Sequence, residues 1–149
     1  MRLTTRGRYA LRASLALARL SLDGSPVSIS RLSEREKISS VFLEQIFFKL
    51  RKAGIVGSVR GPGGGFHFAK PLTELTVKDI LDAAGEGLTL TPCDAHNAVC
   101  DNQNDCVSAA IWMEATTMVN RYFESMTLAS IMEKYKDIFM KRDAAACPD

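Results

Sequence analysis

Residues 41–53 carry the pattern that most constrains the fold of this chain. Apolar side chains recur there at i, i+3, i+4 and i+7, as expected for one face of a helix: Leu43, Ile46, Phe47 and Leu50. Gly54 follows as a left-handed helix terminator. Polar residues occupy the remaining surface: Glu44, Gln45, Lys49, Arg51 and Lys52. The pattern predicts an amphipathic helix that buries one stripe and presents a charged face.

The segments around this helix predict the rest of a compact unit. A helix is expected over residues 9–22, where Leu11, Leu15, Ala18 and Leu22 fall on one face. Residues 27–29 read as a short strand, and Ser30 can cap a second helix that ends near Lys37. After the 41–53 helix, residues 55–59 and 66–68 read as two strands joined by a glycine-rich tip. Two helices joined by a tight turn and followed by a hairpin form the layout of a winged helix-turn-helix, whose second helix enters the major groove of DNA.

The second half of the chain is predicted to be helical apart from one polar segment. Thr76 and Asp79 have the spacing of a capping box, which predicts a helix over residues 77–84. A long helix is expected over residues 107–126, and Thr127 can cap a short helix over 128–135. One stripe of the long helix is apolar, as expected for a core or a dimer interface: Val107, Ile111, Ala115, Met118, Tyr122 and Met126.

The predicted fold class is therefore mainly α with a small β-hairpin wing, a winged helix-turn-helix domain plus a long dimerisation helix. The DNA-binding domain is placed at residues 1–84, with the helix-turn-helix at about 29–53 and the wing at about 55–69. A cysteine-containing loop follows at 85–106, then the dimerisation helix and a short helix at 107–135. Residues 136–149 are expected to be a flexible tail.

The charge of the chain is divided between its halves. Residues 1–70 hold 13 Lys/Arg and 4 Asp/Glu, a net of +9, whereas residues 71–149 hold 6 and 13, a net of −7. These values sum to the net charge of +2. A basic first half suits a polyanion such as DNA. The alternative is a solvated basic surface without a partner, so the motifs decide between the two.

The polar face of the 41–53 helix offers side chains that can read bases. Gln45 can pair with adenine and Glu44 can accept from cytosine N4, whereas Ser39, Ser40, Lys49 and Arg51 suit phosphates. In the wing, Arg60 can enter the minor groove beside glycines that allow a close approach to the backbone. The DNA-binding residues predicted here, together with those implied by the family resemblance given below, are Ser39, Ser40, Phe42, Glu44, Gln45, Lys49, Arg51, Arg60, Gly61, Pro62, Gly63, Gly64 and Gly65.

Three cysteines form a cluster behind this DNA-reading half. Six residues separate Cys93 from Cys100, and five separate Cys100 from Cys106. Thiolates are soft ligands for iron–sulfur clusters or zinc, and structural zinc sites have closer pairs and four ligands. The spacing therefore favours an iron–sulfur cluster, with zinc or redox-active thiols as alternatives.

No apolar stretch reaches the roughly 18 residues of a membrane span, so a cytoplasmic protein without membrane partners is expected. No general base accompanies a nucleophile in a plausible pocket, so the chain is not expected to be an enzyme. In a reducing compartment clustered cysteines favour metal binding over structural disulfides.

Several motifs resemble those of the Rrf-type winged-helix regulators, above all the IscR-type iron–sulfur cluster regulators. The motifs are Met1-Arg2-Leu3-Thr4, Gly7-Arg8-Tyr9-Ala10, Phe42-Leu43-Glu44-Gln45, Leu50-Arg51-Lys52 and Arg60-Gly61-Pro62-Gly63-Gly64-Gly65. The resemblance covers residues 1 to about 135. It implies a homodimer formed through the long helix, a double-stranded DNA operator, and a cluster held by Cys93, Cys100 and Cys106. It also implies control of cluster-assembly genes, with Glu44, Gln45 and Arg60 reading bases.

The chain departs from the IscR-type pattern at the fourth cluster ligand. Those regulators commonly carry a histidine three residues after the last cysteine, where this chain has Ala109. His96, Cys147, a carboxylate or a residue of a partner subunit remain candidates. A 2Fe–2S cluster is favoured and a 4Fe–4S cluster stays open. A second departure is Val41, where relatives often carry a small hydroxyl residue.

Two further functions stay open at this point. One is a nitric-oxide or redox-sensing repressor of the same fold, similar to the NsrR-type regulators. The other is a thiol-redox or electron-transfer protein whose basic half binds an acidic protein, and it predicts no preference among DNA sequences.

Overall fold

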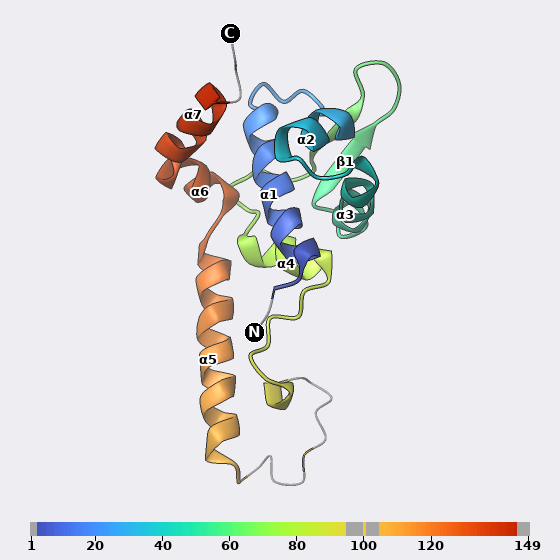
Figure 1. Cartoon of the computed structure of the whole chain (residues 1–149). Helices are drawn as coiled ribbons and strands as arrows, with labels where there is room; N and C mark the ends of the chain where they lie inside the picture. The colour runs from blue at the N-terminus through green and yellow to red at the C-terminus, as the bar shows by residue number, and fades with distance from the viewer. Residues whose placement is uncertain (1–2, 95–99, 101–104, 146–149) are drawn as a thin grey trace.

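The computed structural model describes residues 3–94, 100 and 105–145. Its elements, in chain order, are α1 Thr5–Leu20, α2 Ile29–Glu36, α3 Ser40–Lys52, β1 Val56–Val59, β2 Gly65–Phe68, α4 Val77–Ala84, the short 3-10 helix η1 Pro92–Asp94, α5 Val107–Ser125, α6 Leu128–Lys134 and α7 Lys136–Ala145. Helices α1 to α4 and the hairpin form one body, and α5 extends away from it (Figure 1). The mainly α fold with a two-stranded wing is the predicted one.

The core of the body is built around the predicted stripe of α3. Leu43, Ile46, Phe47 and Leu50 are each fully buried. They belong to one apolar cluster with residues from α1, α2, β1 and α4, such as Ala13, Leu32 and Ile80. Because all four apolar side chains face this cluster, the polar face of α3 points outward.

Side-chain caps fix where the helices begin. Thr4, Ser28, Ser39, Thr76 and Thr127 each accept a hydrogen bond from a backbone N–H in the first turn of the helix that follows. The capping box predicted at Thr76 and Asp79 is confirmed. The cap predicted at Ser30 is wrong, since Ser28 accepts from the Arg31 N–H at 3.2 Å and α2 begins at Ile29.

Two local expectations about the first 30 residues also change. Helix α1 spans Thr5–Leu20, earlier than expected, because Thr4 caps it; Leu22 lies beyond its end and is 68% exposed. The expected strand at 27–29 is reduced to an isolated bridge between Val27 and Phe66. Only Val27 exchanges backbone hydrogen bonds with β2, because Ile29 already belongs to α2.

The wing is an antiparallel pair in which Val56 is opposite Phe68 and Val59 is opposite Gly65. At Gly65 the chain passes so close to Val27 that a β-carbon would lie 2.3 Å from the Val27 carbonyl. A side chain at position 65 would displace the bridge between Val27 and Phe66. This close approach explains why the last residue of the glycine run is a glycine.

The expectation of a flexible tail from residue 136 is wrong as far as Ala145, because α7 occupies Lys136–Ala145. Three ion pairs between residues distant in sequence hold it against α1 and α2. Arg142 contacts Glu36 at 2.9 Å, and Asp143 accepts from Arg19 at 2.9 Å and also from Arg35. Hydrogen bonds from Arg35 and Arg19 outweigh partial burial and lower the pKa of Asp143. Residues 146–149, including Cys147, lie outside the described residues.

Glu36 is the buried member of this network. Its side chain is 1% exposed and is held by Arg12 at 3.2 Å and by Arg142 at 2.9 Å. Arg12 also donates to the Glu36 carbonyl at 2.6 Å, which joins α1 to the end of α2. No helix in the described part of the chain has the length and apolar character needed to cross a membrane.

We expect Glu36→Gln to lower the free energy of unfolding by about 1–3 kcal/mol, because it removes the charge that pairs both arginines in a buried position. Urea denaturation followed by circular dichroism measures the change. Asp82→Asn is the matched control, since Asp82 pairs with Lys78 on an exposed helix surface and such pairs contribute about 0.5 kcal/mol or less. Equal losses in the two variants would contradict the role given to the Glu36 network.

Candidate DNA-binding surface and cysteine segment

The outer face of α3 presents the two predicted base-reading side chains to solvent. Glu44 and Gln45 are both exposed. They line a surface hollow of about 650 Å³ together with Arg6 of α1 and four other residues of α3, namely Val41, Phe48, Lys49 and Lys52. Three cationic side chains and one carboxylate therefore surround this surface.

The predicted phosphate contacts at the start of α3 lie in the turn between the two helices. Ser39 and Ser40 are exposed, and the Ser39 hydroxyl also caps α3 by accepting from the Phe42 N–H at 3.3 Å. The Phe42 ring packs edge-on against Tyr9, with ring centroids 5.7 Å apart. Phe42 therefore anchors α3 to α1 through its side chain, and its predicted contact with DNA stays a prediction.

Two basic residues of α3 also bind other elements of the fold. Lys49 Nζ donates to the Ala84 carbonyl at the end of α4, at 3.3 Å. Arg51 donates to the Ser58 hydroxyl of β1 at 3.3 Å, and its guanidinium lies 6.0 Å from the centre of the Phe48 ring. The hydrogen bonds to Ala84 and Ser58 connect α3 to α4 and to the wing. The sequence assigned both residues to phosphates and did not predict these partners.

The tip of the wing is exposed at Arg60, Gly61, Pro62 and Gly63, whereas Gly64 and Gly65 are half-buried. Gly63 has a φ of 72°, which favours glycine. The predicted wing residues therefore form a small loop with one long cationic side chain, Arg60, at its base.

Sequence reasoning left two features of this surface out. Phe48 is 58% exposed on the outer face of α3, and Arg6 joins the hollow from α1. Phe48 follows Gln45 by three residues, so helical spacing could have placed it on the reading face. The contribution of Arg6 depends on the packing of α1 against α3, which local spacing does not reveal.

The first part of the cysteine segment, residues 85–94, begins beside α1 and then contacts α5. Glu86 is buried, and its carboxylate accepts from the Thr4 backbone N–H at 3.1 Å and from the Thr4 hydroxyl. Burial opposes its ionisation, but hydrogen bonds from Thr4 and Gly7 outweigh burial and lower the pKa of Glu86. A β-carbon at Gly7 would lie 2.5 Å from the Glu86 side chain, so glycine permits this approach.

Farther along, the segment is attached to α5. The Leu90 N–H donates to the Thr116 hydroxyl at 3.1 Å, and Asn120 donates to the Leu88 carbonyl at 3.1 Å. Next, η1 packs against α5 and carries Cys93, which is half-buried. Cys93 is therefore held beside α5, the helix that begins directly after Cys106.

Cys106 is the N-cap of α5. Its Sγ lies 3.1 Å from the Ser108 hydroxyl. This hydrogen bond and the backbone N–H of Ala109 lower the pKa of the Cys106 thiol, as expected for a thiol at a helix N-terminus. The lowered pKa raises the fraction of thiolate, which is the form that binds metals.

The donor chemistry of this segment fits an iron–sulfur cluster, because it supplies three cysteine side chains, one of them with a lowered pKa. Within the described residues no three His, Cys, Asp or Glu side chains converge as a metal site. Cys100 is exposed, and the stretches on either side of it, 95–99 with His96 and 101–104, lie outside the described residues. Ala109 is 3% exposed and faces inward, so it offers no ligand.

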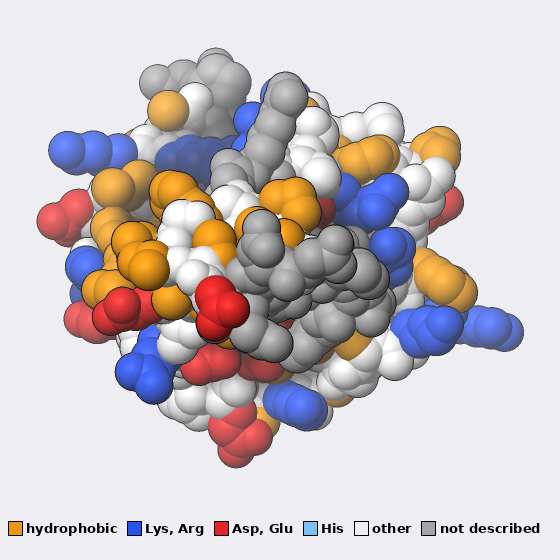
Figure 2. All heavy atoms as spheres, turned by 90° about the horizontal axis from the view of Figure 1, so that it is seen from below, with side chains coloured by type: hydrophobic (Ala, Val, Ile, Leu, Met, Phe, Trp, Pro, Cys, Tyr) orange, Lys and Arg blue, Asp and Glu red, His pale blue; other side chains and the backbone are white. Residues whose placement is uncertain are grey.

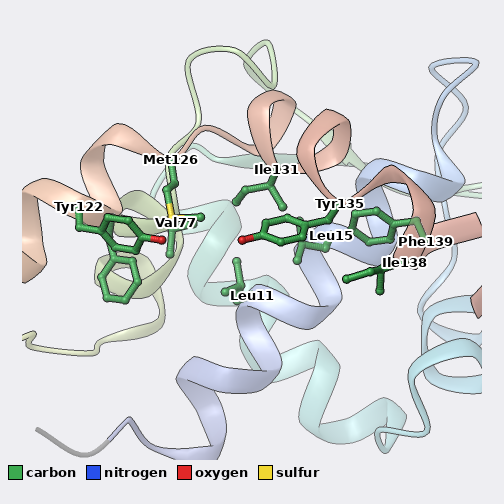
Figure 3. A pocket seen from close by; sticks show the side chains of 10 residues that line it. Leu11, Leu15, Val77, Tyr122, Met126, Ile131, Tyr135, Ile138 and Phe139 are labelled. Carbon is green, nitrogen blue, oxygen red and sulfur yellow. The ribbon is translucent and has the colours of Figure 1, made fainter.

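The stripe predicted on α5 is largely exposed. Val107, Ile111, Met118 and Tyr122 are among the large apolar side chains that face solvent. Apolar side chains gather on the side of the molecule where α5 lies (Figure 2). Near the end of α5 this face continues into an apolar groove of about 450 Å³ between α1, α4, α6 and α7. The hydroxyls of Tyr122 and Tyr135 point toward each other across it (Figure 3).

A winged helix followed by a cysteine segment and a long helix is the layout of a DNA-binding transcription regulator. The family model described as "Iron-dependent Transcriptional regulator" matches residues 3–134. The chain belongs to this family, Rrf2.

Individual relatives agree with this assignment. The HTH-type transcriptional regulator IscR of Yersinia pseudotuberculosis is 39% identical over 132 residues, which cover 89% of this chain and 79% of that protein. Among solved structures, T. potens IscR has a TM-score of 0.74 at 28% identity, covering 93% of this chain and 90% of that one. CymR, the global cysteine regulator of B. subtilis, has a TM-score of 0.75 at 25% identity, covering 90% and 98%. The predicted resemblance is confirmed, and the relatives are regulators and not enzymes.

Proposed function

We propose that this protein is an iron–sulfur-cluster-sensing transcription regulator that reads operator DNA through α3 and the wing and controls genes for cluster assembly. The observation that carries the proposal is the position of the three cysteines. Cys93 lies in η1, which packs against α5, Cys106 occupies the N-cap position of α5 and has a lowered pKa, and Cys100 lies between them in the sequence, in a chain that belongs to a family described as iron-dependent.

In this proposal, α3 lies in the major groove with Glu44 and Gln45 toward the bases. The buried stripe of α3 supports this orientation, because it leaves the opposite face exposed. Ser39, Ser40, Lys49, Arg51 and the wing from Arg60 to Gly65 contact the backbone or the minor groove. A carboxylate near phosphates is unfavourable unless it accepts a hydrogen bond, so Glu44 discriminates in favour of cytosine.

We expect Glu44→Ala to relax sequence preference more than it lowers affinity. Loss of the cytosine contact removes about 1–3 kcal/mol of discrimination at one base pair, and it also removes repulsion from phosphates. Binding to a panel of single-base operator variants measures both effects. Lys52→Ala is the control, since a lost cation weakens binding to all sequences alike. A uniform loss in Glu44→Ala would contradict the base-reading role.

The cluster is assigned to Cys93, Cys100 and Cys106, with 2Fe–2S favoured over 4Fe–4S. When bound, such a cluster supplies a redox- and oxygen-sensitive group whose presence reports iron and sulfide supply. The residues of this chain hold and position it: the α5 N-terminus and Ser108 favour the Cys106 thiolate, and η1 keeps Cys93 beside α5. Binding of the cluster changes the affinity for DNA by the difference between the free energies with which the cluster-loaded and the cluster-free protein bind DNA.

The direct test is a visible spectrum of protein purified without oxygen, with iron, sulfide and zinc assayed on the same sample. We expect broad visible absorption with matched iron and sulfide in the wild type. Cys100→Ala should abolish both while leaving the oligomeric state unchanged. A retained chromophore would rule out this ligand set, and stoichiometric zinc without iron would assign the cysteines a structural role. The same assay on His96→Ala and Cys147→Ala identifies a fourth ligand from this chain.

The buried Ala109 favours a second candidate, a nitric-oxide or redox-sensing repressor similar to the NsrR type. The position that supplies the fourth ligand in IscR-type proteins holds only a methyl group here. A ligand set that differs from that of the IscR type changes whether nitric oxide or oxygen attacks the cluster first. Titration of the loaded protein with nitric oxide, or with oxygen, separates the candidates by which of them bleaches the chromophore at the lower dose.

The third part of the proposal is a homodimer formed through α5. The exposed apolar face of this helix supports it, since a surface of this kind is costly to leave in water. The groove of Figure 3 continues the same face, because Tyr122, Phe123 and Met126 of α5 line it. Two-fold symmetry of the dimer implies a partly palindromic operator.

We expect Met118→Glu to shift the protein toward monomer, because a charge would be buried in the interface without a partner. Sedimentation velocity over a range of protein concentrations measures the shift. Leu22→Glu is the matched control, since Leu22 is 68% exposed and lies just after α1, outside α5. An unchanged dimer with Met118→Glu would place the interface elsewhere.

A further inference from the structure

An apolar pair stands on the outer face of α3 among charged residues. Val41 is 67% exposed and Phe48 is 58% exposed. Neither side chain belongs to an apolar core of the described residues. An exposed phenylalanine gains little free energy from burial, and the ring contact of Phe48 is with Arg51 of the same helix.

Helical spacing puts these two residues on the same face as the proposed base readers. Val41, Glu44, Gln45 and Phe48 follow the pattern i, i+3, i+4, i+7. Seven residues of helix rise about 10 Å, so the apolar side chains lie on either side of Glu44 and Gln45. All four line the same surface hollow.

The surroundings of the pair favour nucleic acid over an apolar protein surface. Arg6, Lys49 and Lys52 line the hollow, and Glu44 is its single carboxylate. Arg51 stands beside them, 6.0 Å from the Phe48 ring centre. A cationic rim of this kind is complementary to phosphates on both sides of a groove.

The Phe48 ring is also supported from one side. Arg51 lies over it and is bonded to Ser58 of β1 at 3.3 Å, so the wing holds the guanidinium in place. A supported ring loses less side-chain freedom when it contacts a ligand.

We infer that Phe48, with Val41 as a second apolar contact, reads the 5-methyl group of thymine beside the base pairs read by Glu44 and Gln45. The thymine methyl is the apolar group that base pairs display in the major groove, and phenylalanine is among the residues that contact it. The inference rests on the proposed position of α3 in that groove. It assigns this protein a preference for thymine that polar readers alone do not give.

The experiment uses the full-length wild-type protein and a random-sequence duplex library to select a bound duplex. Each thymine of that duplex is then replaced singly by deoxyuridine, which removes only the methyl group. We expect at least one replacement to weaken wild-type binding about fourfold, the equivalent of about 0.8 kcal/mol for one buried methyl. Phe48→Ala should bind the thymine and deoxyuridine duplexes equally at that position.

Two further variants make the result specific. Phe48→Leu keeps an apolar side chain and should retain part of the methyl effect. Leu22→Ala removes an equally exposed apolar side chain outside α3 and should retain all of it. Phe48 is exposed, so its replacement leaves the core unchanged, and circular dichroism checks this.

The outcomes separate the inference from the function on which it rests. Selection of a duplex with no deoxyuridine effect, or with one that persists in Phe48→Ala, overturns the thymine inference and leaves sequence-specific binding intact. Failure to select any duplex overturns both. Equal loss of affinity for all duplexes in Phe48→Ala, with the methyl effect retained, assigns the ring to general packing against DNA and also overturns the inference.

Discussion

The buried stripe of α3 is the constraint on which the rest of the structure depends. Its four apolar residues are fully buried against α1, α2, β1 and α4, which fixes the rotation of α3 about its own axis. A helix with that rotation fixed presents one defined set of side chains outward, here Glu44, Gln45 and Phe48. A rotation of α3 by one residue, about 100°, would bury charge and expose the stripe. The chemistry of the reading face therefore depends on apolar packing on its other side.

The DNA-binding body and the cysteine segment meet at α1, where Leu88 packs in an apolar cluster with Leu11 and Leu15 and where polar contacts are also made. Glu86 bonds to Thr4 at the start of α1, and Glu36 joins α1 and α2 to Arg142 of α7. Helix α7 follows α5 and α6 in the chain, so both ends of α5 are connected to elements that touch α1. Charge-assisted bonds depend strongly on geometry. A rearrangement at the start of α5 that strains these bonds alters the free energy of the body that holds α3. In this way a change at the cysteine segment is coupled to the outer face of α3.

Local patterns predicted most of the elements because their signals lie within a few residues. The Thr76 and Asp79 capping box, the α3 stripe and the glycine-rich wing each act over one or two turns of chain. The misses have distant causes. Helix α7 is not predicted because the side chains that hold it, Glu36, Arg19 and Arg35, lie more than 100 residues away in the sequence. The partners of Lys49 and Arg51 depend on how α4 and β1 pack, so charge and spacing identified these residues as basic surface and nothing more.

The cysteine segment shows the same limit in its ligands. Sequence spacing and the family resemblance predict Cys93, Cys100 and Cys106 as donors, and the structure adds that Cys106 occupies the N-cap position of α5 and has a lowered pKa. Residue 109 cannot supply a fourth ligand, since the alanine side chain has no donor atom and is buried. If a thiolate or a carboxylate replaces the histidine of the IscR type, the cluster carries additional negative charge. Imidazole ligands raise the reduction potentials of such clusters relative to thiolates. A fully anionic ligand set would therefore give a lower reduction potential than a set with one histidine. The departure at a single alanine would then change the redox range over which this regulator responds, while the fold that holds α3 stays the same.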